Sequence, residues 1–217
     1  MRPPLTARRV IVVAPHPDDE AIGAWALMRA LRRQGARIAV VVVSDGGASH
    51  PQSRRWPPAR LTRERQRETR RAMATLAIPP HRIRFLGLPD GALETMVARV
   101  SAAIAGALRR CPAPDLIVGP VANDAHGDHR AVAQAIARIP RRGERRLGYR
   151  VWPEDAAGPG HRLRIALSGR EMGIKRRVVR GYRTQAGRIT DAAAGFTMTA
   201  RHLRAFVRPS ERFAVLA

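Results

Sequence analysis

Residues 9–20 read Arg-Val-Ile-Val-Val-Ala-Pro-His-Pro-Asp-Asp-Glu, and this stretch indicates a buried strand that leads directly into a polar loop. After its first residue the run Arg9–Ala14 is continuously apolar and rich in β-branched side chains. Such a run is typical of a strand that is buried on both faces of a parallel sheet. A helix is predicted over residues 20–34, with Gly35 as its stop. The expected apolar face of this helix consists of Ala24, Leu27, Met28 and Leu31.

Apolar runs and amphipathic stretches continue to alternate along the chain. This order of strands and helices predicts an α/β fold with a Rossmann-like, mostly parallel sheet and helices on both of its faces. The expected elements are strands at 37–43, 83–86 and 115–118 and helices at 60–77 and 94–109.

From about residue 141 the pattern becomes less regular. Two further strands are expected at 145–152 and 162–167, followed by a helix to residue 182. Ser168 and Glu171 have the spacing of a capping box that opens this helix. No internal repeat is visible, so residues 1–217 are expected to form a single domain with a less regular C-terminal third.

The first polar cluster, His16, Asp18 and Asp19, follows the first predicted strand. In open α/β sheets, ligands bind in the crevice outside the carboxyl ends of the strands. One imidazole and two carboxylates within four residues form a candidate metal site. An alternative is that one aspartate only caps the following helix. A cap would leave the histidine and the second aspartate unexplained.

A second polar cluster spans residues 123–129, Asn-Asp-Ala-His-Gly-Asp-His, after the strand expected at 115–118. If the two clusters meet, His16, one aspartate and one of His126 or His129 would provide three metal ligands. Three protein ligands and an open position are typical of catalytic zinc, whereas structural zinc sites are closed and usually contain cysteine. A His-Asp-His set also occurs in facial-triad iron oxygenases. Those sites usually lie in all-β barrels, which the strand–helix pattern disfavours, although iron in a hydrolase site stays open.

These two motifs together resemble those of the PIG-L/LmbE-like metal-dependent N-deacetylases, and the resemblance extends over about residues 8–185. The paired motifs Ala-Pro-His-Pro-Asp-Asp-Glu at 14–20 and Ala-His-Gly-Asp-His at 125–129 are the specific part. Weaker similarities support them. They are Val-Ser-Asp-Gly-Gly at 43–47, Arg-Gln-Arg-Glu at 65–68, Phe-Leu-Gly-Leu-Pro-Asp-Gly at 85–91, and residues 175–185, where Thr184 stands in place of a common serine.

The resemblance implies a Zn²⁺-dependent hydrolase that removes an N-acetyl or other N-acyl group from an amino-sugar (N-acetylglucosamine-type) glycoconjugate, with Fe²⁺ or another divalent metal as an alternative. It implies that Asp18 is the general base, that a protonated His126 steadies the oxyanion or serves the leaving amine, and that Asp128 orients His126. The implied metal ligands are His16, Asp19 and His129, and the implied substrate contacts are Arg65 and Asp90.

One inference about Arg65 and Glu68 follows from helical spacing alone. Both residues share the apolar stripe of the helix at 60–77 with Leu61, Ala72 and Leu76. Charges are costly to bury unless they are paired or used. Either the two residues form a structural i, i+3 ion pair or they serve a pocket, and both can hold together.

The chain carries 40 basic and 17 acidic residues, a formal net charge of +23. This charge favours an anionic partner, and it also fits a solvated arginine-rich surface without one. Aromatic residues make up only 4% and no nucleic-acid-binding motif is found, so no specific nucleic acid is expected. A polyanion-binding module on a vestigial hydrolase fold is the alternative from another class. An amidase of an amino-sugar thiol conjugate is a further alternative with the same chemistry.

The cysteine content and the length of the apolar runs predict the cellular location. Cys111 is the single cysteine, so no intrachain disulfide can form, and a reducing, cytoplasmic compartment is expected. No apolar run approaches the roughly 20 residues of a membrane span. The basic composition is compatible with a peripheral position at a membrane face, with a small anionic or lipid-linked glycoconjugate as substrate, and with a homo-oligomer.

Overall fold

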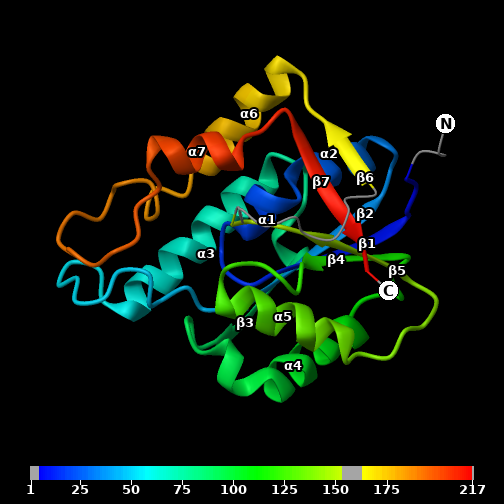
Figure 1. The fold of residues 1–217 in the computed structure, drawn as a ribbon, viewed down its shortest axis with the longest axis horizontal. Helices are drawn as coiled ribbons and strands as arrows, with labels where there is room; N and C mark the ends of the chain where they lie inside the picture. Colours follow the sequence, from blue (N-terminus) through cyan, green and yellow to red (C-terminus); the bar gives the residue numbers. More distant parts are fainter. Residues whose placement is uncertain (1–4, 153–162, 217) are drawn as a thin grey trace.

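The computed structural model of the chain describes residues 5–152 and 163–216. Their centre is a seven-stranded sheet with the strand order β3-β2-β1-β4-β5-β7-β6 (Figure 1). The strands are β1 (Arg9–Ala14), β2 (Arg37–Ser44), β3 (Ile83–Leu88), β4 (Leu116–Pro120), β5 (Arg145–Tyr149), β6 (Leu163–Ala166) and β7 (Ser210–Val215). The helices are α1 (Asp19–Gly23), α2 (Trp25–Arg33), α3 (Pro58–Ala74), α4 (Val97–Arg109), α5 (Gly127–Ala137), α6 (Gly169–Arg180) and α7 (Ala200–Phe206), with short 3₁₀ turns at Pro80–Arg82 and Leu93–Met96.

Five strands, from β3 to β5, run parallel, and β7 joins them antiparallel between β5 and β6. The α/β class and the mostly parallel sheet are therefore confirmed. Strand β1 lies in the middle and pairs with β2 on one side and β4 on the other. The chain thus winds in opposite directions on the two sides of β1. The crevice outside the carboxyl ends of β1 and β4 is the usual ligand position in such a sheet.

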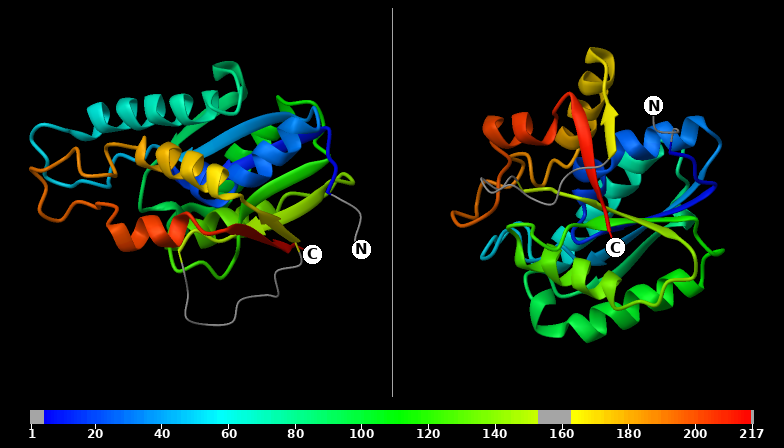
Figure 2. Two further views of the ribbon diagram at one scale, coloured as in Figure 1. Left: turned by 90° about the horizontal axis from the view of Figure 1, so that it is seen from above. Right: turned by 45° about the vertical axis from the view of Figure 1, so that its right-hand side comes forward.

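Helices cover both faces of the sheet, as expected (Figures 1 and 2). Helices α4 and α5 lie on one face, and α1, α2, α3, α6 and α7 lie on the other. The side chains of β1 alternate between the two layers, with Val10 and Val12 in the larger core and Ile11 and Val13 in the smaller one. All four are at most 2% exposed, which explains why β1 has a continuously apolar sequence rather than an alternating one.

The helix predicted over 20–34 is divided into α1 and α2 at Ala24, whose φ of −136° is not helical. The reason is a close contact in the core. A Cβ on Gly23 would lie 2.2 Å from the ring of Tyr149, so α1 rests directly against that ring. Gly35, with φ of +84°, ends α2 as predicted. The helix predicted over 94–109 likewise begins as a 3₁₀ turn before α4.

The C-terminal third contains two elements that sequence patterns did not predict, α7 and β7. The capping box at Ser168 and Glu171 is confirmed at the start of α6. The strand predicted over 145–152 ends at Tyr149, and the one predicted from residue 162 is observed as β6, while Arg162 itself lies outside the described residues. No helix in the described ranges is long and apolar enough to cross a membrane.

Candidate active site

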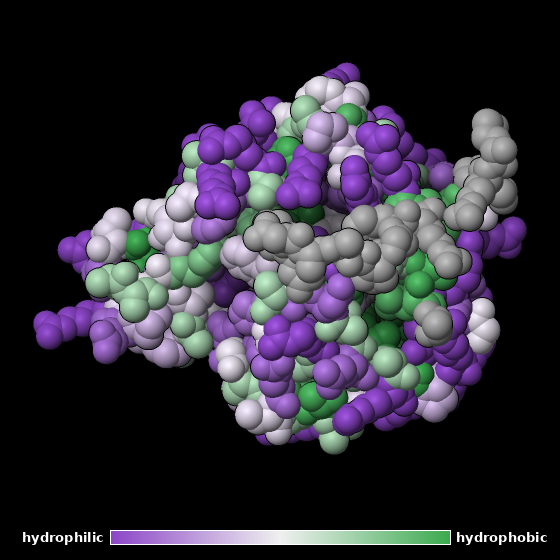
Figure 3. Space-filling model, in the orientation of Figure 1, coloured by the Kyte–Doolittle hydropathy of each residue, from purple (hydrophilic) through white to green (hydrophobic). Residues whose placement is uncertain are grey.

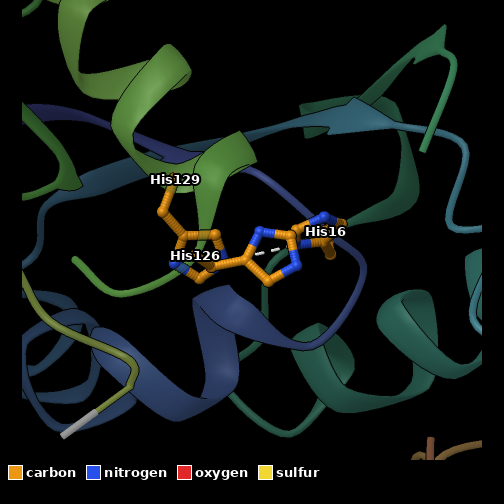
Figure 4. A group of neighbouring side chains, drawn as sticks. All are labelled: His16, His126 and His129. Atoms are coloured by element: carbon orange, nitrogen blue, oxygen red, sulfur yellow. Dashed lines mark hydrogen bonds between the residues drawn. The ribbon is translucent and has the colours of Figure 1, made fainter. Parts of the chain in front are cut away.

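The two polar clusters meet at the carboxyl ends of β1 and β4. His16 lies in the loop between β1 and α1, and His126 and His129 lie at the start of α5. The three imidazole rings turn toward one another, with ring centroids 4.8–5.2 Å apart (Figure 4). All three are at least partly buried, and His129 is completely so. The parallel sheet therefore joins the two motifs, which are more than 100 residues apart in the chain.

Three atoms form a nearly equilateral triangle at this meeting point. The Nδ1 atom of His16 lies 3.1 Å from Oδ2 of Asp19 and 3.2 Å from Nε2 of His129. The remaining side, from His129 Nε2 to Asp19 Oδ2, is 3.1 Å. Ligand atoms of a tetrahedral ion with bonds of 2.0–2.1 Å lie about 3.3 Å apart. The triangle therefore has the dimensions of three protein ligands around one small divalent ion.

Carboxylates on the outer sides of the two rings orient these nitrogens. The Nε2 atom of His16 lies 3.1 Å from Asp128 and 3.2 Å from Asp90. The Nδ1 atom of His129 lies 3.3 Å from Asp124. In the neutral tautomer with its proton on the outer nitrogen, each ring directs that proton toward a carboxylate and presents the lone pair of its inner nitrogen to the triangle. Histidine ligands of metals are commonly held in this way by a second layer of carboxylates.

The charges around the triangle favour a cation at this point. Burial lowers the pKa of His16, but contacts with Asp128, Asp19 and Asp90 raise it well above its ordinary value overall. Burial likewise lowers the pKa of His129, yet Asp19 and Asp124 raise it to about 9. Burial raises the pKa of Asp19, and the two histidines lower it far more. Positive charge is thus stabilised at this point, and the donor set of two imidazoles and one carboxylate suits zinc or iron(II).

Asp18 lies at the start of α1 in a strained backbone conformation, with φ of 135°. In the described part of the chain its side chain makes no capping hydrogen bond to α1, so the capping alternative does not account for it. Burial raises the pKa of Asp18 to about 8, although Arg65, 3.4 Å away, lowers it. A non-glycine residue held at positive φ costs about 1–3 kcal/mol, and such residues concentrate at functional sites. The strain here directs a buried carboxylate into the same pocket as the triangle.

Arg65 connects the loops that follow β1 and β2. Its guanidinium donates hydrogen bonds to the carbonyl of Pro17 at 2.7 Å and to that of Gly46 at 3.1 Å. Gly46 has φ of +68°, and a Cβ there would lie 2.9 Å from the Arg65 guanidinium, so only glycine suits this position. Among the described residues, Glu68 accepts hydrogen bonds from Thr184 instead of pairing with Arg65. The i, i+3 ion pair is therefore not formed, and Arg65 borders the pocket.

His126 is the N-cap residue of α5, and its Nδ1 accepts a hydrogen bond of 3.2 Å from the backbone N–H of Asp128. Burial lowers the pKa of His126, and positive charge on His16 and His129 lowers it further. The resemblance implied a protonated ring, whereas this geometry favours a neutral one with its proton on Nε2. The carboxylate of Asp128 contacts His16 rather than His126, because the N–H groups of Gly91 and Leu93 fix its orientation at 2.8 and 2.9 Å.

The pocket beside these groups has a volume of about 270 Å³. All of the predicted site residues except Asp128 and His129 line it. Those two lie behind the lining, against the rings. Sequence reasoning missed its other parts. They are Asp124, which contacts the outer side of His129, the polar side chains of Ser49 and Gln185, and the apolar side chains Ile22, Val151, Phe196, Met198 and Phe206, which form a wall together with Trp152. Asp124 lies within the second motif, and the usual histidine–carboxylate pairing at metal sites was the signal for it.

Comparisons with known proteins agree with this architecture. Two solved structures share the fold. The N,N'-diacetylchitobiose deacetylase from Pyrococcus horikoshii has a TM-score of 0.69 at 18% identity and covers 97% of this chain and 84% of its own. A conserved protein from Thermus thermophilus has a TM-score of 0.72 at 22% identity and covers 96% of this chain and 94% of its own.

A curated relative from Kineococcus radiotolerans is a 1D-myo-inositol 2-acetamido-2-deoxy-alpha-D-glucopyranoside deacetylase. It is 34% identical over 87 residues, which are 39% of this chain and 24% of the relative. The match thus spans about a quarter of that protein's length. The family profile described as PIG-L, GlcNAc-PI de-N-acetylase, matches residues 11–139, more than half of the chain and all eight predicted site residues. The chain belongs to the PIG-L (GlcNAc-PI de-N-acetylase) family.

Proposed function

We propose that the chain is a metal-dependent hydrolase that removes an N-acyl group, in first place acetyl, from an amino-sugar glycoconjugate. The observation that carries this proposal is the triangle of His16, Asp19 and His129 at the edge of a pocket that the buried carboxylate of Asp18 also lines. Family membership supports it. So do the names of two similar proteins, which are deacetylases of acetamido sugars.

His16, Asp19 and His129 are the proposed ligands, with Zn²⁺ as the first candidate and Fe²⁺ as the second. When bound, a divalent ion supplies positive charge that lowers the pKa of a water molecule and of neighbouring Asp18, and it polarises the amide carbonyl. Asp90, Asp124 and Asp128 hold the protons on the outer nitrogens of the two rings, so that the inner nitrogens stay free to bind.

Asp18 is the proposed general base. It lines the pocket next to Asp19, and Arg65 fixes the adjoining Pro17 carbonyl. Its carboxylate takes a proton from the attacking water as the water oxygen bonds to the amide carbon. The same carboxyl then delivers that proton to the amine nitrogen as the C–N bond breaks, which yields a carboxylic acid and a free amine, and the acid then loses its proton to the amine or to solvent.

His126 is the proposed donor to the oxygen that becomes negative during the attack. Its Nδ1 accepts the Asp128 N–H, so its Nε2–H is available to the pocket. A fixed donor stabilises such an oxygen because it needs no reorganisation during the reaction. Asp128 supports this arrangement through its backbone N–H, while its carboxylate orients His16.

Arg65 and Asp90 line the pocket beside the catalytic groups, and we propose that they contact the sugar. We also propose that the whole chain acts as one domain in the cytoplasm on a small glycoconjugate. Free, half-buried Cys111 is compatible with a reducing compartment.

The experiment is an acetate-release assay with purified, metal-loaded protein over a panel of N-acetylated amino sugars. We expect acetate release that a chelator abolishes and that added Zn²⁺ or Fe²⁺ restores. Turnover that survives complete metal removal, or no release from any N-acyl amino sugar by protein with one bound metal per chain, would contradict the proposal.

A further inference from the structure

A completely buried glutamate, Glu20, lies next to the proposed catalytic groups, although it is neither a proposed metal ligand nor the proposed base. Hydrophilic side chains cover much of the face of the protein shown in Figure 3, where water solvates their charges. A buried carboxylate has no such water and is costly unless donors are hydrogen-bonded to it. The partners of Glu20 therefore indicate why a charge is kept at this position.

Glu20 has a separate hydrogen-bond donor for each of its oxygen atoms. Its Oε2 accepts the backbone N–H of Asp18 at 3.1 Å, and its Oε1 accepts the hydroxyl of Tyr182 at 2.5 Å. Tyr182 is itself completely buried, and it lies just after α6 in the C-terminal third of the chain. The hydroxyl of Tyr182 thus fixes the orientation of the carboxylate that holds the Asp18 backbone.

The peptide group between Pro17 and Asp18 is held on both sides. Its carbonyl, on Pro17, accepts a hydrogen bond of 2.7 Å from the guanidinium of Arg65. Its N–H, on Asp18, is bonded to Glu20. The peptide bond is trans, so the carbonyl and the N–H point in opposite directions. Two buried side chains of opposite charge therefore fix the plane of this one peptide group.

This arrangement accounts for the strained conformation of Asp18, whose φ is 135°. A non-glycine residue stays in such a conformation only where the surrounding contacts determine it. Release of the Pro17–Asp18 peptide would allow φ to relax, and the Asp18 carboxylate would turn with the backbone. Because proton transfer requires a base within hydrogen-bond reach and in the correct orientation, even a small turn would lower turnover.

We infer that Glu20 and Tyr182 are positioning residues for the proposed general base, Asp18, and that together with Arg65 they hold its strained backbone. Among the described residues that line the catalytic pocket, neither Glu20 nor Tyr182 is present, so both act through Asp18. The inference rests on the proposed function for its effect on turnover. The hold on the Asp18 backbone is independent of that function.

The test removes the Tyr182 hydroxyl with and without the base. Tyr182→Phe deletes a single oxygen atom, and its effect is measured in the wild type and in Asp18→Asn. The matched control is Tyr149→Phe. Tyr149 is the other tyrosine of the chain, is also completely buried, and donates a hydrogen bond of 2.9 Å to the Val13 carbonyl. Metal content, kcat and KM are measured for each metal-loaded protein on the N-acetylated amino sugar that the wild type hydrolyses fastest.

We expect Tyr182→Phe to lower kcat about tenfold and to leave KM and metal content within about twofold, because a misplaced base slows the reaction without weakening binding. In Asp18→Asn, the same change should alter kcat less than about twofold, since the effects of residues that act as a unit are not additive. Tyr149→Phe should leave kcat within about twofold in both backgrounds. An equal loss of kcat from Tyr182→Phe in both backgrounds, as a purely structural role would give, or no loss in either, would overturn the inference.

A second measurement tests the hold on the Asp18 backbone without any turnover. Glycine adopts positive φ without the strain that alanine has there, so metal-loaded Asp18→Gly should unfold at a higher urea concentration than Asp18→Ala. In the Tyr182→Phe background this difference should become smaller, whereas in the Tyr149→Phe background it should persist. An unchanged difference in Tyr182→Phe would overturn the inference. A smaller difference there, with no deacetylation by any metal-loaded protein, would support the positioning of Asp18 and refute the proposed function.

Discussion

The Nδ1 atom of His16 and the Nε2 atom of His129 lie 3.2 Å apart, although the two residues are separated by 113 positions in the sequence. Parallel strands β1 and β4 are neighbours in the sheet, so the loops that follow them meet at one edge. These two nitrogens form a triangle with Oδ2 of Asp19. The triangle favours a positive charge at its centre.

Replacement of His129 by alanine is expected to abolish metal binding and activity together, because it removes one of three ligands from the triangle. Metal content per chain should fall well below one, as measured by mass spectrometry after dialysis. The matched control is His81→Ala, since His81 is exposed and lies at the opposite end of the sheet. Full metal content in His129→Ala would exclude this residue as a ligand.

The Asp18→Asn variant should retain the metal and lose turnover. A positioned general base contributes roughly 100- to 10,000-fold to rate, so kcat should fall within that range while the metal content stays near that of the wild type. The matched control is Asp115→Asn, the same substitution at the amino end of β4, where Asp115 accepts hydrogen bonds from the backbone of Arg8 and Arg9. Near-normal kcat in Asp18→Asn would refute the assignment of the base.

Asp124→Asn tests the carboxylate that sequence reasoning missed. Asp124 lies 3.3 Å from the outer nitrogen of His129, so its loss should weaken the metal site without removing a ligand. Loss of such a partner typically costs about 10- to 100-fold in metal affinity. Competition with a chelator measures the dissociation constant. The outcome that contradicts the account is an unchanged affinity in a variant with a normal circular dichroism spectrum.

Glu144 provides a pH-dependent stability test far from the metal. Burial raises the pKa of Glu144, but the Arg142 N–H and Arg146 lower it below its ordinary value overall. A lowered pKa in the folded state stabilises the protein above the unfolded-state pKa, and this contribution disappears as pH falls through the folded-state pKa. Glu144→Gln should therefore lower the free energy of unfolding by about 2 kcal/mol at pH 7.

The same substitution should have less effect at pH 3 than at pH 7, because the contribution of Glu144 disappears as pH falls through its lowered folded-state pKa. Urea denaturation at both pH values measures the difference. Glu64→Gln is a second variant with the same expected direction, because Arg188 donates to Glu64 and, despite the opposing effect of burial, the pKa of Glu64 is also lowered. A pH-independent difference for Glu144→Gln would contradict the stated cause.

The parallel part of the fold could be predicted because its strands are buried on both faces. The strand Arg9–Ala14 has the same bounds in the prediction and in the structure, because a continuously apolar strand is stable only where both of its faces are buried. The strand β7 could not be predicted, because its place between β5 and β6 depends on tertiary pairing and its sequence, Ser-Glu-Arg-Phe-Ala-Val, is mixed. The break at Ala24 likewise depends on the contact between Gly23 and Tyr149.

The end of the sheet that carries the candidate site could also be predicted, because the carboxyl ends of parallel strands lie along one edge, and the two clusters meet there because β1 and β4 are neighbours. The contacts within the site could not be predicted. Whether Asp128 orients His126 or His16 depends on the loop after β3, whose N–H groups at Gly91 and Leu93 fix that carboxylate. Arg65 and Glu68 also have separate partners that the sequence does not reveal. Arg65 contacts the loops after β1 and β2, and Glu68 contacts the segment after α6.

The most direct test of the central claim is a crystal structure of the zinc-loaded protein with anomalous data collected at the zinc edge. The account predicts one strong anomalous peak, from a zinc ion that lies about 2.0–2.2 Å from each of His16 Nδ1, Asp19 Oδ2 and His129 Nε2. Other groups in the pocket provide clear alternatives, because His126 with His16 and His129, or Asp90 with Asp128 and His16, also bring ligand atoms within 4.8 Å of one another. A peak centred on either alternative group, or no peak in a fully folded protein, would contradict the claim.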